Sequence, residues 1–284
     1  MPIENISDTA RWVAYYRAME TDRADAHFRD PYARKLAGPR GEEFVNHMPR
    51  GRQMAWTMIV RTAVFDELIL DAVNRKQADL VLNLAAGLDA RPWRMALPDT
   101  LRWVDVDLPE ILTYKTNMLK DERHRCRYEP IAIDLREEAP RQALFGRLGA
   151  EAKRVLVLTE GLLIYLTREQ VASLARDLHT PSSFRWWVTD LAGPWVLRFM
   201  NKSWGKAVAA GNAPFQFAPA EGTAFFSPNG WRELEFRSTF QESQRLNRQM
   251  SGAWLWRVFG FFTSARGRAE MRRRAGTVLL ERVD

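Results

Sequence analysis

Three carboxylates each follow a short apolar segment of the sequence. Asp107 follows 103–106, Asp134 follows 131–133, and Glu160 comes one residue after 155–158. Apolar segments of this length are typical of strands buried on both faces of a parallel sheet. Ligands of open α/β sheets bind at the carboxyl ends of the strands, which is where these acids would stand. The pattern predicts a nucleotide-type ligand site on an α/β sheet.

The first strand of this sheet ends in a turn of small residues. Leu80–Leu84 is followed by Ala85, Ala86 and Gly87, which allow the backbone to approach a ligand closely. Asp107 lies 22 positions after Ala85, and a carboxylate about 20 residues after such a turn commonly accepts hydrogen bonds from ribose hydroxyls. A strand-loop-helix unit without a ligand is the alternative interpretation.

The dinucleotide-binding pattern G-x-G-x-x-G is incomplete at this turn. Its three glycine positions hold Ala85, Gly87 and Ala90, so two glycines are missing and an NAD-dependent oxidoreductase is disfavoured. Alanine at position 85 costs little only if the local φ is negative.

The other two acids also have two interpretations each. Asp134 could accept a hydrogen bond from the exocyclic amine of an adenine while Leu135 packs on the ring, or it could cap a turn. Glu160 stands in an apolar segment and needs a partner, which could be a positively charged ligand or a nearby arginine.

Two arginines in the N-terminal region could bind a carboxylate with both guanidinium nitrogens. Arg17 and Arg61 each lie in an apolar, helix-like segment, and a guanidinium group matches a carboxylate in a bidentate geometry. The alternative is a surface arginine whose aliphatic part is buried.

The elements that must position these residues alternate between strand and helix. We expect strands at 80–85, 101–106, 128–133, 154–159 and 184–190, and helices at about 91–96, 109–120, 137–148 and 168–179. Thr167 and Gln170 form a predicted capping box at the start of the last helix. Further along, we expect a helix opening at 229–231, a strand at 234–240 and a final strand at 276–283.

We predict one domain over residues 1–284, with a helical cover at 1–75 and the α/β core at 76–284. Residues 10–20 and 53–72 have apolar side chains at helical spacing, and the intervening residues 38–41 read as a loop. Residues 191 to about 226 are interpreted as a helical insertion that could form a lid over the substrate. The aromatic-rich segment 253–262 is interpreted as core, because Arg257 interrupts it.

Composition narrows the class of protein. The chain of 284 residues is 46% hydrophobic and 27% charged, which is ordinary for a soluble globular protein. It has no apolar run long enough to span a bilayer and no apolar signal core near Met1. A single cysteine, Cys126, excludes an internal disulfide and fits a reducing cytoplasm.

The net charge of +7 permits attraction to nucleic acid, anionic membrane or an acidic substrate. The arginines are dispersed and base-reading motifs are absent, so no nucleic-acid partner is expected.

Four segments taken in order resemble the leucine carboxyl methyltransferase family, including its bacterial branch of polyketide-type O-methyltransferases. They are Asn-Leu-Ala-Ala-Gly-Leu-Asp-Ala-Arg-Pro at 83–92, Val-Asp-Val-Asp-Leu-Pro at 104–109, Asp-Leu-Arg at 134–136 and Glu-Gly-Leu-Leu-Ile-Tyr-Leu at 160–166. The resemblance runs from about 16 to 190. It implies a Rossmann-like, seven-stranded, mostly parallel sheet with helices on both faces and an N-terminal helical cover.

The resemblance also implies S-adenosylmethionine as cofactor and gives each candidate residue a role. Arg17 and Arg61 would hold the methionyl carboxylate, although the spacing from Arg17 to 30–32 is longer than the family pattern. Asp107 would bind the ribose. Ala85 and Gly87 would line the loop beneath the cofactor, and Asp134 and Leu135 would bind the adenine. Glu160 would lie near the amino group or the sulfonium of the cofactor. The family usually has glycine at position 85.

The predicted function is therefore an S-adenosylmethionine-dependent O-methyltransferase acting on a small molecule, a carboxylate or a polyketide-like compound. A carboxylate acceptor is ionised at neutral pH and needs no general base, and none of the four histidines has an obvious catalytic setting. The alternatives are an amine or nucleic-acid methyltransferase and a non-catalytic cofactor-binding scaffold. No catalytic residue, metal ligand or oligomeric state is predicted.

Overall fold

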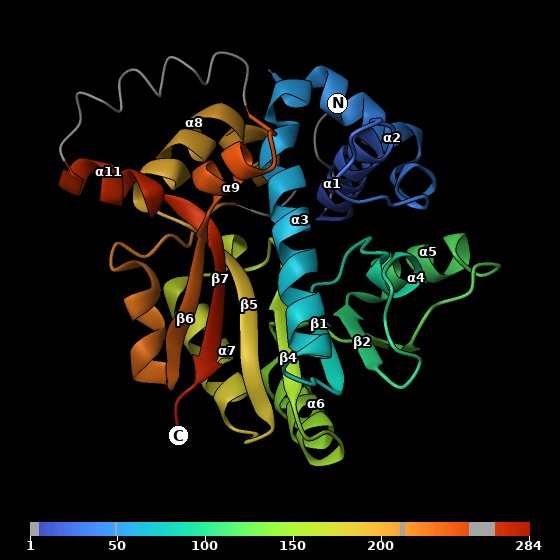
Figure 1. Ribbon diagram of the computed structural model, residues 1–284, viewed down its shortest axis with the longest axis vertical. Coiled ribbons are helices and arrows are strands. Elements are labelled where there is room, and N and C mark those ends of the chain that lie inside the picture. The colour runs from blue at the N-terminus through green and yellow to red at the C-terminus, as the bar shows by residue number, and fades with distance from the viewer. Residues whose placement is uncertain (1–5, 49, 211–213, 250–264) are drawn as a thin grey trace.

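A seven-stranded sheet in the order β3-β2-β1-β4-β5-β7-β6 forms the centre of the molecule (Figure 1). The computed structural model describes residues 6–48, 50–210, 214–249 and 265–284. Neighbouring strands are parallel except at β7, which is antiparallel to both β5 and β6. The strands are β1 Leu80–Leu84, β2 Arg102–Asp107, β3 Arg127–Ala132, β4 Val155–Thr159, β5 Phe184–Ala192, β6 Trp231–Ser238 and β7 Ala275–Arg282.

Helices cover both faces of the sheet. The long helix α3 crosses the front face in Figure 1, whereas α6 and α7 lie behind it. The α-helices are α1 Ile6–Thr21, α2 Ala33–His47, α3 Gly51–Asn74, α4 Arg91–Arg94, α5 Pro109–Met118, α6 Glu138–Glu151, α7 Arg168–His179, α8 Pro194–Ala210, α9 Thr239–Arg245 and α11 Ala265–Arg272. Two 3₁₀ helices, Leu163–Tyr165 and Gly222–Asn229, complete the described elements.

Side chains of each central strand alternate between two apolar layers. Val81 of β1 and Leu156 of β4 pack in the same layer as Ile59 and Phe65 of α3. Their chain neighbours point to the opposite face, where they pack against α6 and α7. All five residues of β1 and of β4 are buried, because a strand covered on both faces has no solvated side. This explains why these two strands are apolar in sequence except for Asn83 and Thr159.

The predicted alternation of strands and helices is confirmed. Each of the five expected strands between residues 80 and 190 exists with bounds shifted by two residues at most, and the final strand is β7. The capping box is also present, since Thr167 accepts from the backbone N–H of Gln170 and the Gln170 side chain accepts from the N–H of Thr167. Local signals of this kind therefore located the elements well.

Two local expectations were wrong. Residues 229–231 do not open a helix, because Asn229 ends a 3₁₀ helix, Gly230 turns the chain at φ +82° and Trp231 begins β6. Residues 38–41 are not a free loop but a kink within α2, where Gly38 has φ +60°. The insertion 191–226 contains α8 and the second 3₁₀ helix. The prediction for 253–262 lies outside the described residues.

Cys126 is buried, and burial raises the pKa of its thiol to about 12. The thiol is therefore protonated at neutral pH and unreactive. Among the described residues, no helix is both long and apolar enough to cross a bilayer.

Candidate functional site

The loop after β1 turns sharply at two positions. Ala85 has φ +53° and Gly87 has φ +52°, whereas the N–H of Ala86 still bonds to the carbonyl of Val106 on β2 at 3.2 Å. Alanine at position 85 would cause little backbone strain only at a negative φ, and the observed φ is positive. The left-handed conformation costs a residue with a Cβ about 1–2 kcal/mol.

Asp107 faces this loop from the end of β2. Its Oδ2 accepts from the N–H of Gly87 at 2.6 Å and its Oδ1 accepts from the N–H of Leu108 at 2.7 Å. Burial raises the pKa of the Asp107 carboxyl above its ordinary value, and these two N–H groups partly offset that rise. Each carboxylate oxygen has a second lone pair, so Asp107 retains the capacity to accept from two ribose hydroxyls.

Glu160 and Arg61 lie together although 99 positions separate them in the chain. Arg61 Nε is 3.0 Å from Glu160 Oε1, and Arg61 Nη1 is 3.3 Å from Asp190 Oδ2 at the end of β5. Gly161, at φ +69°, permits this approach because a Cβ there would lie 3.1 Å from Arg61 Nη1. The partner that Glu160 needed is therefore arginine, one of the two possibilities that the sequence left open.

A second arginine holds the other oxygen of Glu160. Arg91 Nη1 is 2.7 Å from Glu160 Oε2 and 2.6 Å from Asp89 Oδ2, and Arg91 Nε is 2.6 Å from Asp66 Oδ1. Asp66 also binds Arg94 through both of its oxygens at 2.7 Å. The sequence reasoning did not assign Arg91 to the site, although it falls within the family-like segment after β1.

These charges form one connected network at the carboxyl ends of β1, β4 and β5, here called the ion-pair cluster. It comprises Arg61, Arg91, Arg94, Asp66, Asp89, Glu160 and Asp190. Burial alone would raise the pKa of Glu160, but the guanidinium groups of Arg91 and Arg61 outweigh burial and lower it. Burial likewise opposes ionisation of Asp89, yet the adjacent arginines, Arg91 foremost, lower its pKa to about 2. Glu160 and Asp89 are therefore ionised at neutral pH.

Arg17 is linked to the ion-pair cluster through Asp30, whose Oδ2 also lies 3.9 Å from Nε of Arg94. Its Nε is 2.9 Å from Asp30 Oδ2, and its Nη2 donates to the carbonyl of Leu88 at 2.6 Å. Arg17 therefore fixes the helical cover to the loop after β1. The structure brings Arg17, Ala85, Gly87 and Asp107 to this loop, and places Arg61 and Glu160 beside it.

Asp134 and Leu135 follow β3 and stand further along the same edge. Asp134 Oδ1 accepts from the backbone N–H of Arg136 at 2.9 Å, and its carboxylate also pairs with the Arg136 side chain. Asp134 thus caps a turn in this structure. Leu135 packs partly buried against the apolar layer on the α6 side, and its carbonyl accepts from Arg141 at 2.8 Å.

A buried polar network supports the loop from below. Asn83 Nδ2 donates to Asp105 Oδ1 at 3.0 Å and to Asp89 Oδ2 at 3.2 Å, and Lys115 Nζ is 2.7 Å from Asp105 Oδ2. Lys115 and Asp105 are fully buried. The sequence did not indicate this pair, because a single lysine in a helix does not show whether it points toward the core or toward solvent.

The ion-pair cluster has four carboxylates against three arginines, so it carries one excess negative charge. No described residue accepts a hydrogen bond from Arg61 Nη2. The excess negative charge can attract a cationic group, and Arg61 Nη2 can donate to a carboxylate. An amino acid with a sulfonium side chain carries both kinds of group. Within the described ranges, no three His, Cys, Asp or Glu side chains are placed so that together they could hold a metal ion.

The fold and the acids at the edge of the sheet define a class I methyltransferase-type α/β protein. The leucine carboxyl methyltransferase family model matches residues 10–179, more than half of the chain. The chain belongs to the leucine carboxyl methyltransferase family.

Curated relatives support the same family. A Streptomyces coelicolor protein bearing the name "Putative S-adenosyl-L-methionine-dependent methyltransferase" is 36% identical over 178 residues, covering 58% of this chain and 62% of the relative. A Frankia alni protein with the same description is 31% identical over 248 residues, covering 81% and 84%. The first of these alignments spans about three fifths of the relative's length.

Solved structures share the fold at low sequence identity. A DUF574 family protein from Streptomyces avermitilis superimposes with a TM-score of 0.61 at 12% identity, over 96% of this chain and 97% of that chain. The magnesium protoporphyrin IX methyltransferase of Synechocystis, with bound S-adenosylhomocysteine, gives 0.51 at 12% identity over 85% and 92%. At this identity the likeness establishes the fold alone.

Proposed function

We propose that the chain is an S-adenosylmethionine-dependent O-methyltransferase whose acceptor is a small-molecule carboxylate. It is proposed to act in the cytoplasm as one domain with the cover 1–75 and the insertion 191–226. Family membership supports methyl transfer. The choice of a carboxylate rests on one observation, which is the position of the histidines.

Each of the four histidines is held by a backbone carbonyl away from the ion-pair cluster. Their carbonyl partners are Leu246 for His27, Glu43 for His47, Cys126 for His124 and Val283 for His179. A phenol, with an ordinary pKa near 10, needs a base or a strong depression of its pKa, whereas a carboxylate is already ionised at pH 7. A site without an available histidine therefore favours a carboxylate nucleophile.

The other ionisable groups near Glu160 are also poor bases. Glu160 and Asp190 are committed to arginines, and burial raises the pKa of Tyr165 to about 12. Tyr165 is consequently a phenol that can donate a hydrogen bond but does not remove a proton at neutral pH. Orientation, rather than proton transfer, is the contribution expected of these residues.

The residues at this edge are suited to hold the cofactor. Asp107 can accept from the ribose, Arg61 Nη2 can donate to the methionyl carboxylate, and the excess negative charge of the ion-pair cluster favours a cation. When bound, S-adenosylmethionine supplies a methyl group on a positively charged sulfur. Asp134 accepts from Arg136 and retains acceptor capacity for the exocyclic amine of the adenine.

An apolar cluster beside Tyr165 can cover the acceptor. Phe44 from α2 and Phe215 from the insertion pack together with Tyr165 and with Leu197 and Met200 of α8. The cluster joins the N-terminal cover to the insertion over the carboxyl ends of the strands. Such a cover excludes water from the reacting groups and suits an acceptor with an apolar body.

Methyl-labelled S-adenosylmethionine, incubated with the chain and a panel of carboxylic acids and matched phenols, tests the proposal. We expect label in the acids, and we expect mild alkali to release it as methanol, because methyl esters hydrolyse under conditions where methyl ethers survive. Asp107→Ala is the control and should abolish turnover. Label confined to base-stable ethers, amines or nucleic acid would contradict the proposal, and cofactor binding without turnover would favour a scaffold.

A further inference from the structure

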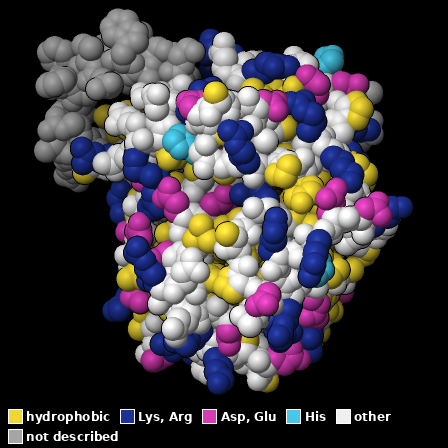
Figure 2. Space-filling model, turned by 45° about the vertical axis from the view of Figure 1, so that its right-hand side comes forward, with side chains coloured by type: hydrophobic (Ala, Val, Ile, Leu, Met, Phe, Trp, Pro, Cys, Tyr) yellow, Lys and Arg dark blue, Asp and Glu magenta, His cyan; other side chains and the backbone are white. Residues whose placement is uncertain are grey.

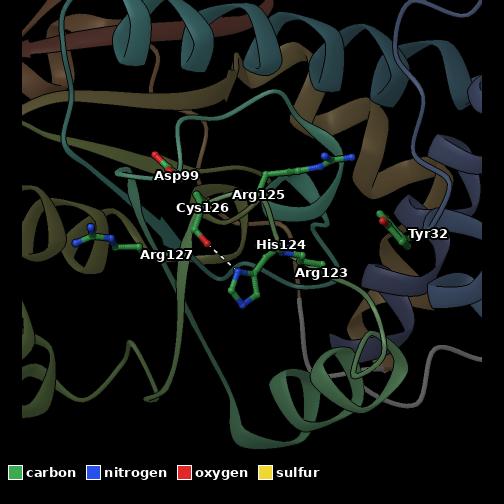
Figure 3. Close-up of a pocket in the computed structure, with 7 residues that line it drawn as sticks. All are labelled: Tyr32, Asp99, Arg123, His124, Arg125, Cys126 and Arg127. Carbon is green, nitrogen blue, oxygen red and sulfur yellow. Dashed lines mark hydrogen bonds between the residues drawn. The ribbon is translucent and has the colours of Figure 1, made fainter.

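A groove of about 630 Å³ lies where β2 and β3 begin, at the opposite ends of these strands from Asp107 and Asp134 (Figure 3). Arg123 to Arg127 run along it, between Tyr32 from the cover and Asp99 from the loop before β2. It is lined by Tyr32, Asp99, Arg123, His124, Arg125, Cys126 and Arg127. None of these residues takes part in the ion-pair cluster.

Three exposed arginines of the groove have no carboxylate partner. Within the described ranges, Arg123, Arg125 and Arg127 form no salt bridge, whereas the neighbouring Arg102 is paired with both Glu129 and Glu151. Three like charges at alternate positions repel one another. Their placement costs stability unless an anion occupies the groove.

The backbone holds these arginines in place. The N–H of Arg125 bonds to the carbonyl of Pro92 at 2.7 Å, and the N–H of Arg127 bonds to the carbonyl of Leu101 at 2.9 Å. Between them Cys126 is buried, and its carbonyl contacts His124 Nδ1 at 2.7 Å. The segment is therefore preorganised, which reduces the ordering cost that a ligand must meet.

The two ends of the groove differ in charge. In Figure 3, Arg123 and Arg125 lie on the side of Tyr32, whereas Arg127 and Asp99 lie on the opposite side. The Asp99 carboxylate repels an anion from its end. An anion is therefore expected between Arg123, Arg125 and Tyr32, where guanidinium groups can bind oxyanions in a bidentate manner.

The surroundings favour a small ligand over a nucleic acid. The groove falls within the size range of small-molecule sites. Next to Arg123, Glu122 is paired with Lys35 at 3.5 Å, so Lys35 does not extend the positive charge of the groove. Lys and Arg side chains on the face drawn in Figure 2 are mixed with Asp and Glu and do not form a continuous basic stripe, although such a stripe is the electrostatic footprint of nucleic-acid binding.

From these observations we infer that the groove is a second ligand site, distinct from the carboxyl-end edge of the sheet, for a small molecule that carries phosphate groups. Arg123 and Arg125 bind the phosphate oxygens, and the ring of Tyr32 flanks the rest of the ligand. The inference does not depend on the proposed methyl transfer.

Calorimetric titration of the full chain with tripolyphosphate tests the inference, with citrate and a 20-nucleotide single-stranded RNA as comparison ligands at the same ionic strength. We expect tripolyphosphate to bind, and Arg123→Gln/Arg125→Gln to weaken binding at least about tenfold, as expected for the loss of charge-assisted hydrogen bonds. Within the described ranges these two side chains form no hydrogen bond or salt bridge, so without ligand the variant should be at least as thermally stable as the unsubstituted chain and should keep its affinity for S-adenosylhomocysteine.

The control Arg185→Gln/Arg232→Gln removes the same charge from β5 and β6, far along the sheet from β3, and should leave tripolyphosphate affinity unchanged. Equal losses in the two double variants would mean a nonspecific charge effect and overturn the inference. Citrate binding as tightly as tripolyphosphate would overturn the phosphate assignment, and tighter binding of RNA at Arg123 and Arg125 would replace it with a nucleic-acid surface.

Discussion

Arg91 and Glu160 lie 69 positions apart in the chain and are joined by a contact of 2.7 Å between Nη1 and Oε2. Arg91 follows β1 and Glu160 follows β4, two adjacent parallel strands at the centre of the sheet. The pair therefore links the loop after β1 to the loop after β4. Because Glu160 also binds Arg61, it connects the sheet to the N-terminal cover.

Removing the charge of Glu160 should destabilise the protein at neutral pH. Glu160→Gln keeps the shape of the side chain but leaves Arg61 and Arg91 without their shared carboxylate. We expect the free energy of unfolding to fall by about 1–3 kcal/mol, measured by urea denaturation at pH 7. Glu151→Gln is the matched control, because Glu151 also contacts two arginines, Arg102 and Arg147, but is solvent-exposed. If both substitutions lower the free energy of unfolding equally, the burial of Glu160 does not strengthen its ion pairs.

Glycine at position 85 should stabilise the protein. Ala85 has φ +53°, so Ala85→Gly relieves about 1–2 kcal/mol of backbone strain and returns about 0.5–1 kcal/mol through the greater entropy of the unfolded chain. We expect the free energy of unfolding, measured by thermal or urea denaturation, to rise by up to about 1.5 kcal/mol. Ala90→Gly in the same loop, where φ is −113°, should give no gain. A loss of stability in Ala85→Gly would mean that the methyl group makes contacts worth more than the strain.

The sequence predicted the strands at the centre of the sheet because burial on both faces gives continuous apolar runs. It also predicted a ligand-facing carboxylate at position 107 from its spacing to the turn after β1, and in the structure Asp107 accepts from Gly87 of that turn. The error at 229–231 arose because Asn-Gly signals a turn without indicating whether a helix or a strand follows. The turn there leads into β6.

The ion-pair cluster was only partly predictable. Glu160 was expected to have a cationic partner, because an acid in an apolar segment must be compensated. Which arginines provide that charge depends on the order of strands β1, β4 and β5, and no local pattern specifies that order. For the same reason Asp190 and Asp66 were not recognised, although both contact arginines of the site.

Acid should destabilise the protein partly through Asp89. The arginines around this carboxyl lower its pKa from 3.8 to about 2 despite burial. Because the pKa is lower in the folded state, ionised Asp89 stabilises the folded chain fully above its unfolded-state pKa. This stabilisation is lost as the pH falls from about 5 to about 2. It amounts to about 2 kcal/mol. Urea denaturation of Asp89→Asn should therefore show a weaker pH dependence over this range than the unsubstituted chain, and curves of equal slope would contradict the assignment.

Substitution of Asp107 should weaken cofactor binding while leaving the loop in place. In Asp107→Asn, the amide oxygen can still accept from the N–H of Gly87 or of Leu108, but the charge-assisted bonds proposed for the ribose are lost. We expect affinity for S-adenosylhomocysteine, measured by calorimetry, to fall about tenfold or more. Asp121→Asn, an exposed residue after α5, serves as the control and should bind normally. If Asp107→Asn binds as tightly as the unsubstituted chain, the ribose must be held by other groups, and Asp107 has only the structural role of accepting from Gly87.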